Sequence, residues 1–288
     1  MKLYADHYFH IGAAHYSSGK PCQDYSISGS NGTEAYAIVS DGCSTGGNTD
    51  VGARVLALAT LQALKDSHLF VGRADMDSRL IASAQQATLK STQLMLGLNR
   101  VDMLSTCAYI FINQNSGFVH VQGDGVIALR YRNGETMMFR SDWTKNAPFY
   151  PAYDDADAIT FIDRIHGGNV VEATMSIKQC SSRVEEENIN LIPFQDARSG
   201  FVVELSREKL SELEFIAVFS DGVTQVEGVS WQEAVSSLLA FKNTTGEFAK
   251  RRMIRGIKDF HQVGRGPIDD ISFAVVRIEQ VIDLAEEV

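Results

Sequence analysis

Residues 35–52 constrain the fold more than any other stretch of the sequence. Ala35 to Val39 is an apolar run that fits a buried strand. Ser40-Asp41-Gly42 ends the run, a Gly-rich loop follows, and a helical pattern begins at Val51. A carboxylate at the end of a buried strand is held rigidly, and a glycine beside it lets a backbone carbonyl approach a ligand. We therefore take Asp41 as the residue around which the chain is organised.

Two other apolar runs have acidic residues at their ends. Ser220-Asp221-Gly222 follows the run from Phe215 to Phe219, and Asp269-Asp270 precedes the run from Ile271 to Ile278. Carboxylates that converge from strand ends, without Cys or His at ligand spacing, suit a hard cation such as Mg²⁺ or Mn²⁺. The sequence therefore predicts a metal site built from distant segments.

A hairpin is predicted to bring a further acid to Asp41. Tyr25 to Ser28 has the pattern of a strand, and Asn31-Gly32 is a turn signal between it and the Ala35 run. Asp24 and Asp41 lie at similar distances on either side of this turn. We expect them to meet at the open end of the hairpin.

The rest of the chain alternates between helical and strand-rich blocks. The apolar spacing predicts helices over 50–65 and 77–98 and later over 231–241 and 247–263. Short turns, including Gly123-Asp124-Gly125, predict an antiparallel meander between the two pairs. Residues 141–199 match no clear pattern, and we expect loops, a strand near 170–178 and a surface insertion. The predicted strands of the meander are 105–112, 117–122, 126–132 and 135–140.

These elements predict an α+β fold with two antiparallel sheets and helices outside them, in a single domain spanning residues 1–288. Apolar residues make up 44 % of the chain, enough for a full core. The net charge of −10 argues against nucleic acid or an anionic membrane surface as the main partner. The sequence has no apolar run of membrane-spanning length, no signal-peptide core and four widely spaced cysteines. We therefore expect a cytoplasmic monomer with reduced thiols.

Six short motifs occur in one order along the chain. Each is common alone, but the ordered set is specific. The set resembles the type 2C, metal-dependent (PPM family) serine/threonine protein phosphatases, and is most similar to a bacterial branch whose Gly-x-x-His-x-x-x-Gly-x-Pro-Cys-Gln-Asp opening matches Gly12 through Asp24. The resemblance extends from Gly12 to Ile278. The motifs are Gln23-Asp24, Val39-Ser40-Asp41-Gly42, Ser105-Thr106, Gly123-Asp124-Gly125, Phe219-Ser220-Asp221-Gly222-Val223 and Asp269-Asp270-Ile271-Ser272.

The resemblance implies a four-layer α-β-β-α sandwich with a metal cluster at one edge, and a variable flap within about 141–199. It implies that Asp41 bridges two Mg²⁺ or Mn²⁺ ions and that Gly42 offers its carbonyl to one. Asp221 and Asp269 would bind the other ion, and Asp124 a third. Asp24 would position metal-bound waters.

The implied activity is hydrolysis of phosphoserine or phosphothreonine on cytoplasmic proteins, opposing a serine/threonine kinase. Two cations roughly 3.5–4 Å apart lower the pKa of a bridging water and clamp the charge on phosphorus. Without metal, the clustered carboxylates would raise one another's pKa values. Metal binding should then stabilise the fold as well as activate it.

Departures from the family pattern leave alternatives open. Gly19 stands where many members carry an arginine for the substrate phosphate, with Lys20 or His15 as possible substitutes, and Cys43 stands where eukaryotic relatives often carry a histidine. A catalytically weak or inactive module that binds a phosphoprotein or nucleotide, and a small-molecule phosphatase, are the rival functions.

Several of these residues also have ordinary structural readings. Asp124 fits a hairpin turn, Asp270 a hydrogen-bonding neighbour and His15 a packed loop histidine. A basic helix side from Lys250 to Lys258 fits a solvated surface or a dock for an acidic partner.

Overall fold

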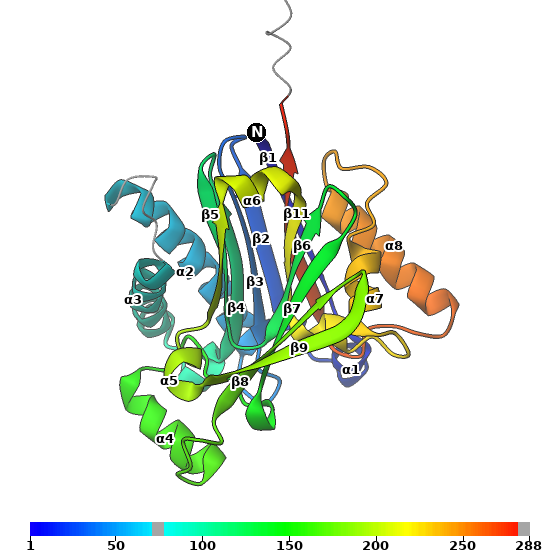
Figure 1. Ribbon diagram of the computed structural model, residues 1–288. Coiled ribbons are helices and arrows are strands. Elements are labelled where there is room, and N and C mark those ends of the chain that lie inside the picture. The colour runs from blue at the N-terminus through cyan, green and yellow to red at the C-terminus, as the bar shows by residue number, and fades with distance from the viewer. Residues whose placement is uncertain (71–77, 282–288) are drawn as a thin grey trace, which may run out of the picture.

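Two antiparallel sheets form the centre of the molecule, as Figure 1 shows in a computed structural model that describes residues 1–70 and 78–281. The larger sheet has seven strands and the smaller has five. In spatial order, the larger sheet contains β1 (Lys2–His10), β12 (Ile271–Glu279), β11 (Leu213–Phe219), β6 (Gly125–Tyr131), β7 (Thr136–Trp143), β8 (Thr174–Ser181) and β9 (Val184–Pro193). The smaller contains β10 (Phe201–Ser206), β5 (Ser116–Gln122), β4 (Ser105–Ile112), β3 (Ala35–Gly42) and β2 (Asp24–Ser30).

The two sheets pack face to face through alternate residues of their strands. Ala35, Ala37 and Val39 of β3 are buried in the same cluster as Ala274 and Val276 of β12. Successive side chains of a strand point to opposite faces, so the other residues of the same strands face outward. These outward faces are also apolar and therefore need a covering layer.

Helices cover both outer faces. Helices α2 (Thr49–Phe70) and α3 (Ser78–Leu96) pack on the smaller sheet, and α7 (Trp231–Leu238) and α8 (Phe248–Gln262) on the larger, on opposite sides of the molecule (Figure 1). The predicted four-layer α-β-β-α sandwich is confirmed. Shorter helical elements are α1 (Ala13–Ser18), η1 (Arg100–Met103), η2 (Thr144–Asn146), α5 (Phe194–Ala197), α6 (Arg207–Glu212) and η3 (Asp221–Thr224). Among the described residues, no helix combines the length and apolarity needed to cross a bilayer.

The connection from β5 to β6 differs from the predicted hairpin. β5 pairs with β4 and β10, whereas β6 pairs with β11 and β7, so Gly123-Asp124-Gly125 carries the chain from one sheet to the other. Gly123 and Gly125 have φ values of 107° and 150°, which allow this abrupt change of direction. The short turn was misread because its length fits a hairpin equally well.

Residues 144–200, here called the flap segment, are more regular than predicted. They contain α4 (Asp155–His166), and β8 and β9 extend the larger sheet at one end. A small core around Trp143, Phe161 and Phe194 joins these elements. The polar sequence of β9 concealed the strand because it lies at the sheet edge, where charged side chains are common.

Candidate metal centre

Asp24 and Asp41 are directly opposed across the β2–β3 hairpin, as the sequence predicted. Asp24 is only 1 % exposed. Its Oδ2 accepts a 2.6 Å hydrogen bond from the Ser220 hydroxyl, and the Ser220 oxygen accepts one from the backbone N–H of Ser272. Within the described chain, Oδ1 of Asp24 has no hydrogen-bond partner. Oδ2 of Asp24 is thus held by hydrogen bonds that join β2 to Ser220 and Ser272. Oδ1 remains available to accept a hydrogen bond.

The strand register brings Asp124 and Asp221 to the same edge. Asp41 is paired with Thr106 on β4. The next residue of β4, Cys107, is paired with Gln122 at the end of β5. Asp124 follows in the crossing between the sheets. On the larger sheet, Phe219 is paired with Val126 and Phe273, which places Asp221 beside the start of β6 and of β12.

The Asp269-Asp270 pair stands at the start of β12, where its two members have different surroundings. Gln225 donates to Asp221 at 3.0 Å and to Asp269 at 3.2 Å, linking the two acids. Gly222 allows the two strand-end segments to approach, because a Cβ there would overlap the Asp270 carbonyl oxygen. Asp269 is partly exposed, whereas Asp270 is buried.

Asp270 links the N-terminal segment to the start of β12 through its carboxylate. Its Oδ1 accepts the Gly12 N–H at 2.7 Å, and its Oδ2 accepts the Gln23 N–H at 2.6 Å and contacts His15 Nδ1 at 2.8 Å. Potential ligand atoms of His15, Asp269 and Asp270 lie within 4.8 Å of one another. Because both Asp270 oxygens are already occupied, we assign Asp270 and His15 to holding the N-terminal segment against β12. This agrees with the structural readings of His15 and Asp270.

Burial and mutual repulsion penalise ionisation of the acidic cluster. Burial raises the pKa of Asp24 to about 7, despite the opposing hydrogen bond from Ser220. Burial also raises the pKa of Asp124 to about 8, with a further contribution from the charge of Asp221. The pKa values of Asp41 and Asp221 are raised, first by burial and then by neighbouring carboxylates. The ionised form of these acids is therefore disfavoured unless positive charge is added to the cluster.

Gly19 has a conformational role at the position where the family pattern often has arginine. It ends α1 with φ 69°, a left-handed conformation that favours glycine. The adjacent Lys20 is exposed, and its Nζ donates to the Ser44 carbonyl at 3.3 Å, in the loop just after Asp41. The sequence predicted a loop over this region and missed α1, which is too short to show a helical period.

The flap segment reaches the same edge through Tyr150. Burial raises the pKa of Tyr150, and the charges of Cys43, Asp124 and Asp41 add to this effect, which places the phenol among these groups. Gln86 of α3 donates to the carbonyls of Pro151 and Tyr153 and so anchors this part of the flap segment. Sequence reasoning missed Tyr150 and Gln225, because a single polar residue in a loop has no distinctive spacing. It included Ser220 in a motif but did not predict its hydrogen bond to Asp24.

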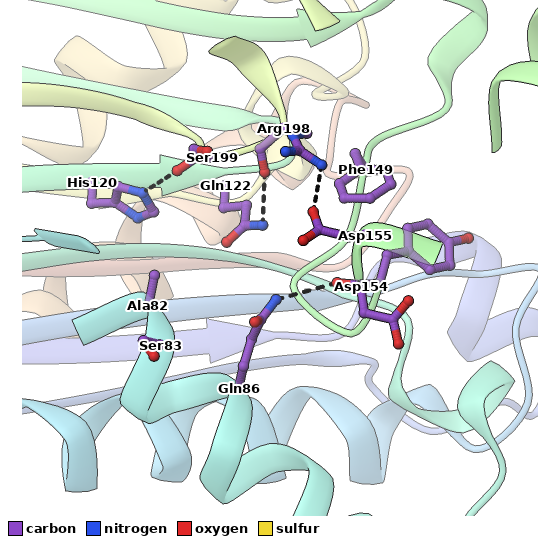
Figure 2. A pocket seen from close by; sticks show the side chains of 11 residues that line it. Ala82, Ser83, Gln86, His120, Gln122, Phe149, Asp154, Asp155, Arg198 and Ser199 are labelled. Carbon is purple, nitrogen blue, oxygen red and sulfur yellow. Dashed lines mark hydrogen bonds and ion pairs between the residues drawn. The ribbon is translucent and has the colours of Figure 1, made fainter. Parts of the chain in front are cut away.

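A polar cavity of about 340 Å³ lies between α3, β5 and the flap segment (Figure 2). His120 is 2 % exposed, and its Nε2 lies 2.9 Å from the Ser199 carbonyl. Arg198 pairs with Asp155 across the cavity, and Gln122 donates to the Arg198 carbonyl. Gln122 is two residues from Asp124, so this cavity adjoins the acidic edge and is lined by other side chains.

A four-layer sandwich with acidic strand ends gathered at one edge defines the class of metal-dependent protein phosphatases. A family model described as Protein phosphatase 2C matches residues 11–253. The chain belongs to the protein phosphatase 2C family. A search of curated proteins found no match.

Solved structures with this fold are distant in sequence. The serine/threonine phosphatase Stp1 from Staphylococcus aureus is 14 % identical, with a TM-score of 0.51, and the match covers 97 % of this chain and 96 % of that one. The catalytic domain of the phosphatase PstP, in complex with 2 manganese ions, is 14 % identical with a TM-score of 0.51 and coverage of 97 % and 99 %. A C. elegans sex-determining protein is 12 % identical with a TM-score of 0.56 and coverage of 97 % and 65 %. At these identities the likeness shows the fold.

Proposed function

We propose that this chain is a divalent-metal-dependent phosphatase that hydrolyses phosphoserine and phosphothreonine in proteins. The observation that carries the proposal is the convergence of Asp24, Asp41, Asp124, Asp221 and Asp269 at one edge of the two sheets. Family membership supports the reaction class. A serine/threonine kinase would supply the phosphorylated protein.

The chemistry of the acidic edge fits hard divalent cations. All the proposed donors are oxygens, which Mg²⁺ and Mn²⁺ prefer. The raised pKa values of Asp24 and Asp124 indicate a site that favours added positive charge. We assign Asp41, the Gly42 carbonyl, Asp221 and Asp269 as ligands for two ions, and Asp124 as a ligand for a third. The PstP catalytic domain, which shares the fold and was solved with 2 manganese ions, supports divalent-metal binding by this fold.

When bound, such cations supply a Lewis acid that lowers the pKa of water and neutralises charge on a phosphoryl group. The protein would contribute orientation. Asp24, fixed through Oδ2 by Ser220, presents Oδ1 as an acceptor that can hold a water proton. Gln225 keeps Asp221 and Asp269 in fixed relative positions. Lys20, which follows α1 and contacts the loop after Asp41 through the Ser44 carbonyl, offers a cation to the substrate phosphate.

The test is hydrolysis of an aryl phosphate and of a phosphothreonine peptide by purified protein. Activity should require Mn²⁺ or Mg²⁺, disappear with chelator and fall by at least about a hundredfold in Asp41→Asn, the scale of losing a principal electrostatic group. Asp163→Asn, an exposed change of the same type on α4, serves as the matched control. Activity in chelator, or an Asp41→Asn variant as active as wild type at limiting metal, would refute the proposal.

A regulatory module that binds a phosphoprotein without turnover is the second candidate. Gly19, which caps α1 and brings no cation to the site, favours it. This candidate predicts Mn²⁺ binding and phosphopeptide binding with no release of phosphate. The hydrolysis assay therefore separates the two functions.

A further inference from the structure

The strongest feature outside the acidic edge is a basic groove on the helix-covered outer face of the larger sheet. It lies between α8 and residues 240–243, has a volume of about 680 Å³, and is here called the α8 groove. Five cationic side chains and one carboxylate line it, a net charge of +4, whereas the whole chain has a net charge of −10. The charged lining residues are Lys242, Arg251, Arg252, Arg255, Lys258 and Asp259.

The cations are poorly neutralised by the protein itself. Arg255 and Asp259 are 4.0 Å apart and both mostly exposed, a separation at which an ion pair contributes little. Within residues 1–70 and 78–281, neither Lys242 nor Lys258 forms an ion pair with a carboxylate. Burial lowers the pKa of Arg252, the charge of Asp259 partly offsets this effect, and the charge of Arg255 lowers the pKa further. An added acidic group would therefore relieve repulsion in the groove.

The groove also has an apolar floor and a fixed wall. Phe241 and Phe248 contact each other edge to face with ring centroids 5.1 Å apart, and Ile254 is 48 % exposed on the outer surface of α8. Arg252 Nε donates to the Ser237 carbonyl at 2.6 Å, which joins α8 to α7. The site is thus a shaped surface with both charge and apolar area.

We propose that the α8 groove docks an acidic protein segment that carries apolar side chains. The carboxylates of such a segment would pair with Arg251, Arg255 and Lys258, which share one side of α8 by their spacing of four and three residues. Its apolar side chains would contact Phe241 and Ile254. Nucleic acid is disfavoured because the surrounding protein is strongly acidic, and a flat anionic membrane cannot fill a concave groove. The proposal is independent of the phosphatase reaction.

The experiment measures binding of a labelled synthetic peptide of Glu, Leu and Ala to the full chain by fluorescence anisotropy. The wild-type protein should bind it with an affinity that falls as salt rises, because exposed charges are screened. The double variant Arg255→Glu/Lys258→Glu should bind about tenfold or more weakly, and Ile254→Ser several-fold more weakly. Lys65→Glu/Lys90→Glu, on α2 and α3 at the opposite face, makes the same change in net charge and should bind like wild type.

Three results would overturn the proposal. The first is no peptide binding, and the second is equal loss in the two double variants, which would indicate a net-charge effect alone. The third is tighter binding of a duplex DNA or of phosphatidylserine vesicles through Arg255 and Lys258. Circular dichroism melts establish that each variant is folded. Each variant should also hydrolyse aryl phosphate at the wild-type rate.

Discussion

At the scale of single residues, the acidic edge is a set of carboxylates whose ionisation the fold opposes. Asp24 and Asp41 face each other on adjacent strands, and Asp124 and Asp221 add charge from two other segments. Such an arrangement is costly unless a counter-charge compensates for it. The same repulsion that would destabilise the metal-free protein would give affinity for cations.

This repulsion gives the metal-free protein a defined pH dependence. The folded pKa values of Asp24 and Asp124, about 7 and 8, exceed the ordinary value of 3.8, so the folded chain binds more protons than the unfolded chain between these values. Their stabilising contribution is fully present below pH 3.8 and is lost as pH rises through 7 to 8. The free energy of unfolding in chelator should therefore decrease from pH 5.5 to pH 8.5, as measured by urea denaturation.

Two comparisons isolate the acidic cluster from other titrating groups. Asp124→Asn should reduce the decrease, and saturating Mn²⁺ should largely remove it. A chelated wild-type protein and an Asp124→Asn variant with the same pH profile would show that this carboxyl group is ordinarily ionised in the fold.

Lys20 is the residue-scale prediction for substrate binding. Lys20→Ala should raise the KM for a phosphate monoester roughly threefold, as expected for about 0.7 kcal/mol from an exposed charge pair, with kcat little changed. Lys20→Arg should retain the wild-type KM, and Lys65→Ala is the control. A normal KM in Lys20→Ala would remove this residue from the phosphate site.

At the scale of elements, the loop after β3 depends on a cap from η1, which follows α2 and α3 in the chain. Asp102 of η1 is buried, and its Oδ1 accepts hydrogen bonds from the Asn48 N–H and the Asn48 amide, while its Oδ2 accepts the Asn99 N–H. This carboxylate holds the turn between β3 and α2 against η1. The loop that follows Asp41 is thereby held at its α2 end, at Asn48.

Removal of this cap should destabilise the fold without touching the acidic cluster. Asp102→Ala should lower the free energy of unfolding by about 2–3 kcal/mol, because three donors lose a charged acceptor. Asp163→Ala on the exposed side of α4 should change it by less than about 0.5 kcal/mol. Urea denaturation measures both, and a similar small effect for the two variants would contradict the assigned role.

Elements also show where prediction from sequence succeeds. The β2–β3 pairing was predictable because turn residues between apolar runs fix the register. The β5–β6 crossing was not, because a two-residue connection can close a hairpin or join two sheets. The Ser220–Asp24 bond and the Asp270–His15 contact join residues 196 and 255 positions apart, and no local pattern encodes such pairs.

At the scale of the whole molecule, the protein has two faces of different chemistry. The acidic edge lies where Asp24, Asp41 and Asp221 meet, and the α8 groove presents +4 on an otherwise acidic protein. The flap segment adds two strands and its own small core beside the acidic edge. We infer that catalysis and docking would occupy separate surfaces. The assignment of residues 1–288 to a single domain, with a variable flap within about 141–199, stays a prediction.

Calorimetric titration of the chelator-treated protein with Mn²⁺ tests the central claim most directly. The account predicts at least two ions bound per wild-type chain, as expected for a paired-metal site. Asp221→Asn should lose at least one of them, and Asp163→Asn should bind like wild type. A wild-type chain that binds no Mn²⁺, or an Asp221→Asn variant with unchanged stoichiometry and affinity, would contradict the assignment of the acidic edge as a metal centre.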